Sequence, residues 1–180
     1  MTKPPTLILI GLRGSGKTTL GKRLAAELDR PFVDLDDETA RLMHAPDAGA
    51  AIREHSLRAF RAAETRALAG VLRGTGLVLA LGGGTPTAPG ASDLIAEEQR
   101  RARVRVAYLR ASATTLRERL AQDPTDRPPL LGGEDPLAEI ERVLEQRDVP
   151  YRTLANAVID VDGLDPELAF AALRDWADDT

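Results

Sequence analysis

The feature that most constrains this 180-residue chain is a glycine-rich loop near its N-terminus. Residues 11–18 read GLRGSGKT and fit the pattern G-x-x-x-x-G-K-[ST]. An apolar, β-branched run at residues 6–10 precedes the loop, and leucines at four-residue spacing follow it. A strand, such a loop and a helix in this order direct backbone N–H groups and the positive helix end at an anion. The sequence therefore predicts a site for a nucleoside triphosphate.

The loop also indicates how the nucleotide is bound. Lys17 would reach the β- and γ-phosphates, and the Thr18 hydroxyl would bind Mg²⁺. The Asn-Lys-x-Asp motif that reads guanine does not occur, because Asn156 is the only asparagine in the chain. ATP is therefore favoured over GTP. We expect ATP to contact the loop and the first helical residues at Gly11, Gly14, Ser15, Gly16, Lys17, Thr18 and Thr19.

Composition and charge exclude several classes of function. The chain has 24 Lys and Arg against 28 Asp and Glu, a net charge of −4, and so offers no diffuse attraction to nucleic acid or an anionic membrane. It has no cysteine, which rules out disulfides and thiol chemistry. Its apolar runs are much shorter than the ~20 residues that span a bilayer. We expect a single domain over residues 1–180 that is cytoplasmic and monomeric and binds small anions.

Segments typical of strands and helices alternate along the chain. Apolar runs predict strands at residues 6–10, 32–36, 77–81, 104–109 and 157–161, with helical patterns between them. Residues 44–55 lack a clear period and predict a small excursion from the main layers. The alternation predicts a three-layer α/β domain with a five-stranded parallel sheet. Right-handed crossovers would bring the carboxyl ends of the strands to one edge.

Two carboxylates mark the end of the second predicted strand. Asp34 and Asp36 stand two positions apart, where the alternation of a strand would send both to the same side. One could hold Mg²⁺ through water while the other accepts a proton or hydrogen bond from an acceptor hydroxyl. Capping of the next helix by Asp36 or Asp37 is the competing interpretation.

Three arginines are candidates for binding small anions. Arg61 lies three residues before Glu64 on a predicted helix, although an exposed ion pair of little worth would show the same spacing. Arg147 lies at the margin of an apolar helical stripe, where a half-buried guanidinium needs an anion. Arg127 lies in a long segment rich in Pro, Gly and charge, and it could close over a nucleotide or merely be solvated. His44 and His55 have no partner at ligand spacing.

Taken in order, these motifs resemble those of the shikimate kinase family over about residues 7–161. The motifs are residues 11–18, Asp34-Leu35-Asp36, Phe60-Arg61-x-x-Glu64, Gly82-Gly83-Gly84, Arg127-Pro128-Pro129-Leu130 and Arg147-x-x-Pro150-Tyr151. The resemblance implies transfer of the γ-phosphoryl group of ATP to the 3-hydroxyl of shikimate, with Mg²⁺ as cofactor. It also implies a P-loop kinase fold with strand order 2-3-1-4-5, a small helical substrate-binding insertion at residues 37–65 and a lid at residues 122–135.

On the nucleotide side, the resemblance implies a role for each matching residue. Lys17 and Arg127 would be catalytic, and Arg127 would be the lid arginine that contacts ATP. Thr18 and Asp34 would lie at the metal. Arg119 would stack on adenine.

On the acceptor side, the resemblance makes Asp36 catalytic, because it would hold the acceptor hydroxyls and help to remove the proton. Arg61 and Arg147 would clamp the substrate carboxylate, and Glu64 would orient the arginines. The backbone at Gly82, Gly83 and Gly84 would approach the substrate ring where no Cβ fits.

The chain departs from the family pattern at two places. Ser56-Leu57 stands where the family commonly has Gly-Glu, and Thr85-Pro86 follows the glycine triplet in place of a small-apolar pair. Two other functions are compatible with the loop and the fold class. One is a related small-molecule kinase such as a gluconate kinase, and the other is a catalytically silent kinase-like binding or regulatory module.

Overall fold

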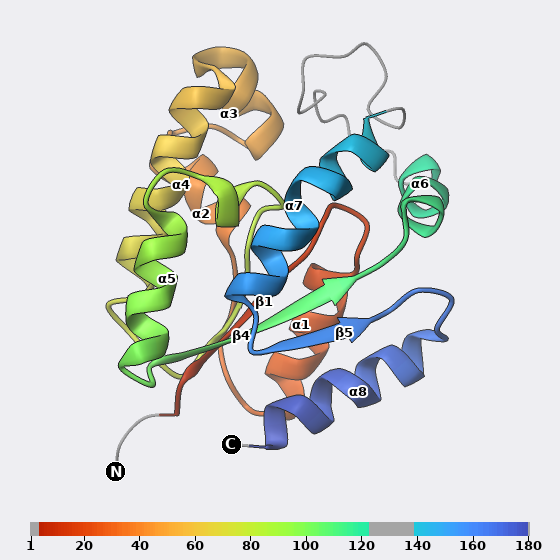
Figure 1. Cartoon of the computed structure of the whole chain (residues 1–180). Helices are drawn as coiled ribbons and strands as arrows, with labels where there is room; N and C mark the ends of the chain where they lie inside the picture. Colours follow the sequence, from red (N-terminus) through yellow and green to blue (C-terminus); the bar gives the residue numbers. More distant parts are fainter. Residues whose placement is uncertain (1–3, 123–138, 180) are drawn as a thin grey trace.

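Five parallel strands form the middle layer of the computed structural model, which describes residues 4–122 and 139–179 (Figure 1). The strands are β1 (Thr6–Ile10), β2 (Phe32–Asp34), β3 (Val78–Ala80), β4 (Val104–Arg110) and β5 (Ala157–Asp160). Their order is β2-β3-β1-β4-β5, and each neighbouring pair is parallel. The predicted fold class and strand order are confirmed.

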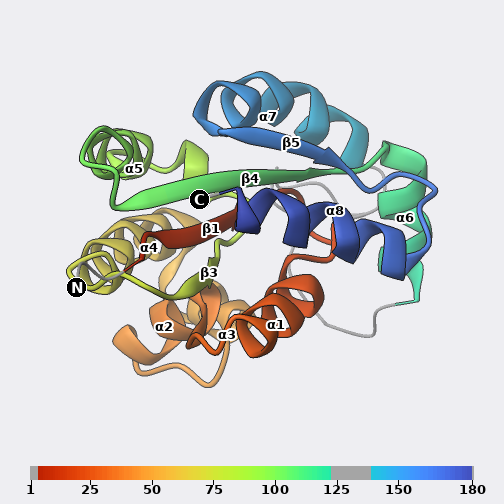
Figure 2. The ribbon, with the colours of Figure 1, turned by 90° about the horizontal axis from the view of Figure 1, so that it is seen from below.

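Helices cover both faces of this sheet (Figures 1 and 2). They are α1 (Lys17–Glu27), α2 (Leu35–Leu42), α3 (Ala48–His55), α4 (Leu57–Val71), α5 (Ala91–Arg100), α6 (Ala113–Ala121), α7 (Ile140–Leu154) and α8 (Pro166–Asp178), with a 3₁₀ turn, η1 (Thr85–Thr87). Helices α1 and α8 lie on one face, and α5 and α7 lie on the other. None of the helices in the described part of the chain is long and apolar enough to cross a membrane.

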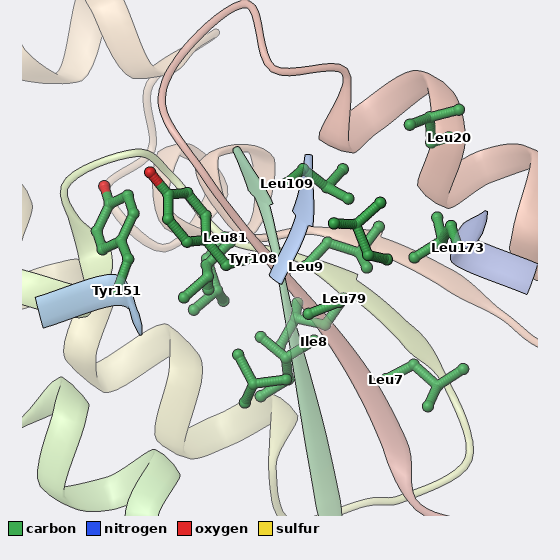
Figure 3. Packing of buried hydrophobic residues seen from close by; sticks show 14 of the residues in the cluster. Leu7, Ile8, Leu9, Leu20, Leu79, Leu81, Tyr108, Leu109, Tyr151 and Leu173 are labelled. Atoms are coloured by element: carbon green, nitrogen blue, oxygen red, sulfur yellow. The ribbon is translucent and has the colours of Figure 1, made fainter. Parts of the chain in front are cut away.

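The core is built on the two central strands. All five residues of β1 and all three of β3 are buried, as expected for strands covered on both faces. In Figure 3, Leu20 of α1 and Leu173 of α8 lie on one side of the strands, whereas Tyr108 and Tyr151 lie on the other. This continuous packing fixes the edge at which the loops after β1, β2 and β3 meet.

The second strand is shorter than predicted. It ends at Asp34, and Asp36 lies in the first turn of α2. The Asp34 carboxylate accepts a hydrogen bond from the Asp36 backbone N–H at 3.1 Å and thereby caps the helix. The interpretation in which Asp36 or Asp37 is the cap is therefore wrong, and strand alternation is not what orients Asp36.

The segment expected to be an excursion contains a regular helix. Asp47 accepts a hydrogen bond from the Ala50 backbone N–H at 2.8 Å and begins α3. Small side chains of α3, Ala48 and Ala51, pack against Phe60 of α4. Residues 37–65 thus include α3 and parts of α2 and α4, and their role as a substrate-binding subdomain stays a prediction. Most of the lid predicted at residues 122–135 lies outside the described residues.

Ser56, between α3 and α4, adopts a backbone conformation that favours glycine, with φ 113° and ψ 154°. A side chain in this region costs about 1–3 kcal/mol. The Ser56 hydroxyl also accepts a weak hydrogen bond, 3.3 Å long, from the Ala59 N–H. Replacing serine by glycine at an N-cap costs only a few tenths of a kcal/mol of stability. Glycine also increases the conformational entropy of the unfolded chain, which lowers stability slightly.

We therefore expect Ser56→Gly to raise the free energy of unfolding by about 0.5–1 kcal/mol in urea titrations. The matched variant Ser56→Ala keeps the strain and loses the cap, so it should be less stable than wild type. A glycine variant that is also less stable than wild type would show that this position is not strained.

Candidate active site

The phosphate-binding loop joins β1 to α1 and depends on its glycines. Gly16 precedes α1 in the left-handed region at φ 92°, which exposes the N–H groups of the first helical turn. Gly11 has a different reason to be glycine. A Cβ on Gly11 would lie 2.6 Å from the Leu109 carbonyl oxygen and 2.6 Å from Ser15 Oγ. Gly11 therefore lets the loop pack against β4.

A cavity of about 460 Å³ opens over the loop. It brings together seven residues predicted to bind ATP: Gly14, Ser15, Gly16, Lys17, Thr18, Thr19 and Arg119. Asp34 and Asp36 also line it, together with Gly82 and Gly83 of the glycine triplet. Gly11 is not among the lining residues. The carboxyl ends of β1, β2 and β3 therefore meet at one cavity, as the topology requires.

The cavity also has an apolar end, which was not predicted from the sequence. Val161, Leu164, Pro166 and Ala169 line it, and Arg119 lies beside them. The Arg119 guanidinium donates to the Gly14 carbonyl at 3.2 Å and to the Val161 carbonyl at 3.4 Å. The four apolar residues follow β5, and their position after a parallel strand was the signal that could have identified them.

Oxygen atoms suitable for a hard cation lie near the loop. The Thr18 hydroxyl donates to an Asp34 carboxylate oxygen at 2.9 Å. Burial raises the pKa of Asp34, and the nearby Asp36 carboxylate raises it further. Within residues 4–122 and 139–179, no group of three or more His, Cys, Asp and Glu side chains could hold a metal. A hydroxyl and one carboxylate nevertheless fit Mg²⁺, which usually takes its remaining ligands from water and phosphate.

A second cavity of about 90 Å³ adjoins the first. Asp36, Arg61, Gly83 and Gly84 line it, and so do apolar side chains of α3, α4, α6 and α7. Arg13, Asp36 and Gly83 line both cavities. Arg13 and the buried Glu139 of the second cavity were not singled out from the sequence. Asp36 therefore lies where a nucleotide and a small acceptor would meet.

The Arg61–Glu64 pair lies inside the protein, so the interpretation as an exposed ion pair is wrong. The Glu64 side chain is 0% exposed and that of Arg61 is 17% exposed. Glu64 accepts a hydrogen bond from the Arg61 guanidinium and another, 2.6 Å long, from the Thr85 hydroxyl. Burial raises the pKa of Glu64, although Arg61 and Thr85 partly offset this effect. Glu64 thus holds Arg61 beside the second cavity.

The glycine triplet is required by the protein's own side chains at two of its three positions. A Cβ on Gly82 would collide with the carboxylates of Asp36 and Glu64, and one on Gly84 would collide with the Arg61 guanidinium. A Cβ on Gly83 would make ordinary contacts, the nearest at 3.5 Å. Of the three, Gly83 alone lines both cavities.

This difference predicts unequal effects of alanine in the triplet. We expect Gly84→Ala to lower the free energy of unfolding by about 2 kcal/mol, because the Arg61 guanidinium must leave its place beside Glu64. Gly83→Ala should change it by less than about 0.5 kcal/mol. Urea titrations of both variants test this prediction, and equal destabilisation would contradict it.

Arg147 and Tyr151 of α7 hold the same carbonyl. The Arg147 guanidinium donates to the Gly83 carbonyl oxygen at 2.8 Å, and the Tyr151 hydroxyl donates to the same oxygen. Tyr151 packs edge-on against Tyr108 with ring centroids 5.1 Å apart. Burial raises the pKa of Tyr151 to about 12, so the hydroxyl remains a donor at neutral pH. This contact of Tyr151 was not anticipated, although the residue belongs to a quoted motif.

Arg147 is half-buried, as its place on the apolar margin suggested. Its guanidinium contacts the carbonyl oxygen of Gly83, and the next residue, Gly84, lies against the Arg61 guanidinium. A joint clamp of Arg61 and Arg147 on one carboxylate stays a prediction. Arg127 lies outside the described residues.

Comparisons with known proteins bear on the family and the fold of this chain. A model of the shikimate kinase family matches residues 13–177. A shikimate kinase from Stenotrophomonas maltophilia is 41% identical over 166 residues, which cover 90% of this chain and 86% of the relative. A solved shikimate kinase from Acinetobacter baumannii, in complex with shikimate, has a TM-score of 0.83 at 30% identity and covers 98% of this chain and 95% of its own. The enzyme from Bacteroides thetaiotaomicron has a TM-score of 0.79 at 27% identity, covering 97% and 98%.

A gluconokinase from Sinorhizobium meliloti is more distant. Its TM-score is 0.60 at 18% identity, with 99% of this chain and 97% of that chain covered. An identity this low shows a shared fold alone.

Proposed function

Because this chain belongs to the shikimate kinase family, we propose that it transfers the γ-phosphoryl group of ATP to the 3-hydroxyl of shikimate. The observation that carries the proposal is the junction of two cavities at Asp36. The larger cavity contains the phosphate-binding loop, and the smaller contains a half-buried arginine that a fully buried carboxylate holds in place. A nucleotide and a small carboxylic acid fit this pair of environments.

In the nucleotide cavity, the loop N–H groups and Lys17 bind the phosphates. The Lys17 ammonium donates to the Leu12 carbonyl at 2.9 Å, within the loop, and so lies where a β- or γ-phosphate would bind. Adenine would lie at the apolar end, against Arg119 and Pro166. Thr18 and Asp34 would hold Mg²⁺, which neutralises charge on the phosphates when bound.

In the acceptor cavity, Arg61 binds the carboxylate of shikimate and Asp36 accepts a hydrogen bond from its 3-hydroxyl. As the phosphoryl group transfers, the hydroxyl proton passes to Asp36 and the charge on the phosphates is balanced by Lys17. Most of the rate then comes from positioning the two substrates in line. Arg147, whose guanidinium contacts the Gly83 carbonyl, supplies a second cation for the carboxylate of shikimate. The part assigned to Arg127 stays a prediction.

We further propose that the enzyme is a cytoplasmic monomer. Residues of one chain line both cavities, so the site needs no second copy to complete it. Its need for ATP suits a compartment in which ATP is abundant.

The test is release of ADP by the purified protein with ATP and Mg²⁺, with shikimate, with gluconate and with neither. We expect release that depends on shikimate, with shikimate 3-phosphate as product. Release with gluconate and none with shikimate would support a gluconate kinase instead. Tight shikimate binding without any product would support a catalytically silent module.

A further inference from the structure

Thr85 brings a hydroxyl into the interior of the acceptor site. It follows the glycine triplet, where a small apolar residue was expected, and its side chain is 0% exposed. The hydroxyl donates to Glu64 Oε1 at 2.6 Å, while the Arg61 guanidinium donates to Oε2. Arg61 and Thr85 therefore hold the two oxygens of one fully buried carboxylate between them.

We infer that Thr85 is a positioning residue for the acceptor site, because its hydroxyl holds the Glu64 carboxylate in the orientation that fixes the Arg61 guanidinium. The inference rests on the proposed function where it names shikimate as the ligand of Arg61. Thr85 itself does not line either cavity and acts through Glu64.

The place of the hydroxyl explains why it is needed. Glu64 Oε1 lies 2.6 Å from where a Cβ on Gly82 would be, and an Asp36 carboxylate oxygen faces the same point. Two carboxylates therefore approach each other across Gly82. Without the hydroxyl, Oε1 of the fully buried Glu64 would face a like charge with no hydrogen-bond donor of its own, which is costly for an ionised group.

The groups around Glu64 define how it titrates. They are Arg61 on its own helix, Asp36 from α2, Tyr151 from α7 with Arg147 beside it, and the Thr85 hydroxyl from η1. Burial and Asp36 raise the pKa of Glu64, whereas Arg61 and Thr85 lower it. Removing the hydroxyl should therefore raise this pKa further. A protonated Glu64 attracts Arg61 less, so that the guanidinium can turn away from the substrate.

The experiment compares Thr85→Val, which keeps the shape of the side chain and removes the hydroxyl, with Thr85→Ser, which restores the hydroxyl. We expect Thr85→Val to raise KM for shikimate about tenfold, with kcat and KM for ATP changed by less than about threefold. The acidic limb of the pH profile of kcat/KM for shikimate should move to higher pH, because the pKa of Glu64 rises when the hydroxyl is removed. Thr85→Ser should behave like wild type.

Thr87→Val is the matched control. Thr87 lies in the same turn, is exposed, and donates to the Gly84 carbonyl at 2.9 Å without touching Glu64. It should leave KM and the pH profile unchanged. If Thr85→Val does not fold, Thr85→Ala is used instead, because alanine also lacks the hydroxyl and is smaller than valine. The inference would be overturned if a folded variant without the Thr85 hydroxyl kept both the wild-type KM for shikimate and the wild-type acidic limb of the pH profile.

A measurement of folding stability, which needs no enzymatic activity, separates this inference from the proposed function. A carboxyl whose pKa is raised on folding contributes stability at low pH that is lost as pH rises through the folded-state pKa. Thr85→Val should therefore lose more stability relative to wild type at pH 8 than at pH 4, in urea titrations. A difference that is independent of pH would overturn the role of the hydroxyl. Absence of shikimate turnover by wild type would overturn only the proposed function.

Discussion

Replacement of Lys17 by alanine is expected to lower kcat for shikimate phosphorylation by about a thousandfold. The Lys17 ammonium is held in the loop by the Leu12 carbonyl at 2.9 Å, in the cavity that also contains Asp34 and Asp36. No other lysine lines that cavity among the described residues. The charge that develops on the transferring phosphoryl group would therefore lose the cation that the loop holds in place.

The matched control is Lys22→Ala, because Lys22 lies five residues later on α1 and is exposed. It should retain wild-type kcat. Steady-state release of ADP with saturating shikimate measures both variants, and circular dichroism verifies that each is folded. A Lys17→Ala enzyme within tenfold of wild type would contradict the proposed part of Lys17 in catalysis.

Replacement of Arg147 by alanine is expected to weaken shikimate binding about 30-fold and to leave ATP binding within about twofold. The guanidinium is half-buried and reaches the Gly83 carbonyl at the junction of the two cavities. A substrate carboxylate would lose a charge-assisted hydrogen bond there, whereas the phosphates of ATP lie against the loop. Isothermal titration with each ligand measures the two affinities separately.

Arg142→Ala serves as the control, since Arg142 is an exposed arginine five residues earlier on the same helix. It should change neither affinity. The same titrations on Arg61→Ala should give a loss for shikimate at least as large as that of Arg147→Ala, because Arg61 lines the acceptor cavity directly. Equal losses for ATP and shikimate in Arg147→Ala would count against the clamp.

Local patterns were sufficient for all five strands and for their order along the chain. Residues 6–10 form a strand with the predicted bounds, because an uninterrupted apolar run carries its own signal. The second strand ended two residues early, since the Asp34 carboxylate captures a backbone N–H and begins α2. The residue pattern at 44–55 did not predict the helix α3, because its short side chains give little hydrophobic periodicity, whereas the family resemblance implied a helical insertion there.

The sequence by itself determined the phosphate-binding loop, the strand order implied by resemblance, and most of the residues that line the larger cavity. The tertiary structure decided which of those residues contact one another. Arg61 and Glu64 have the spacing of a surface ion pair, and only the packing of distant segments against α4 takes Glu64 inside, where it also meets Thr85, 21 residues away. Tyr151 meets Gly83 across 68 residues. Spacing along a chain reports which side chains share a helix face, but burial and the charge of distant neighbours arise only when the layers pack, and these set the chemistry of the site.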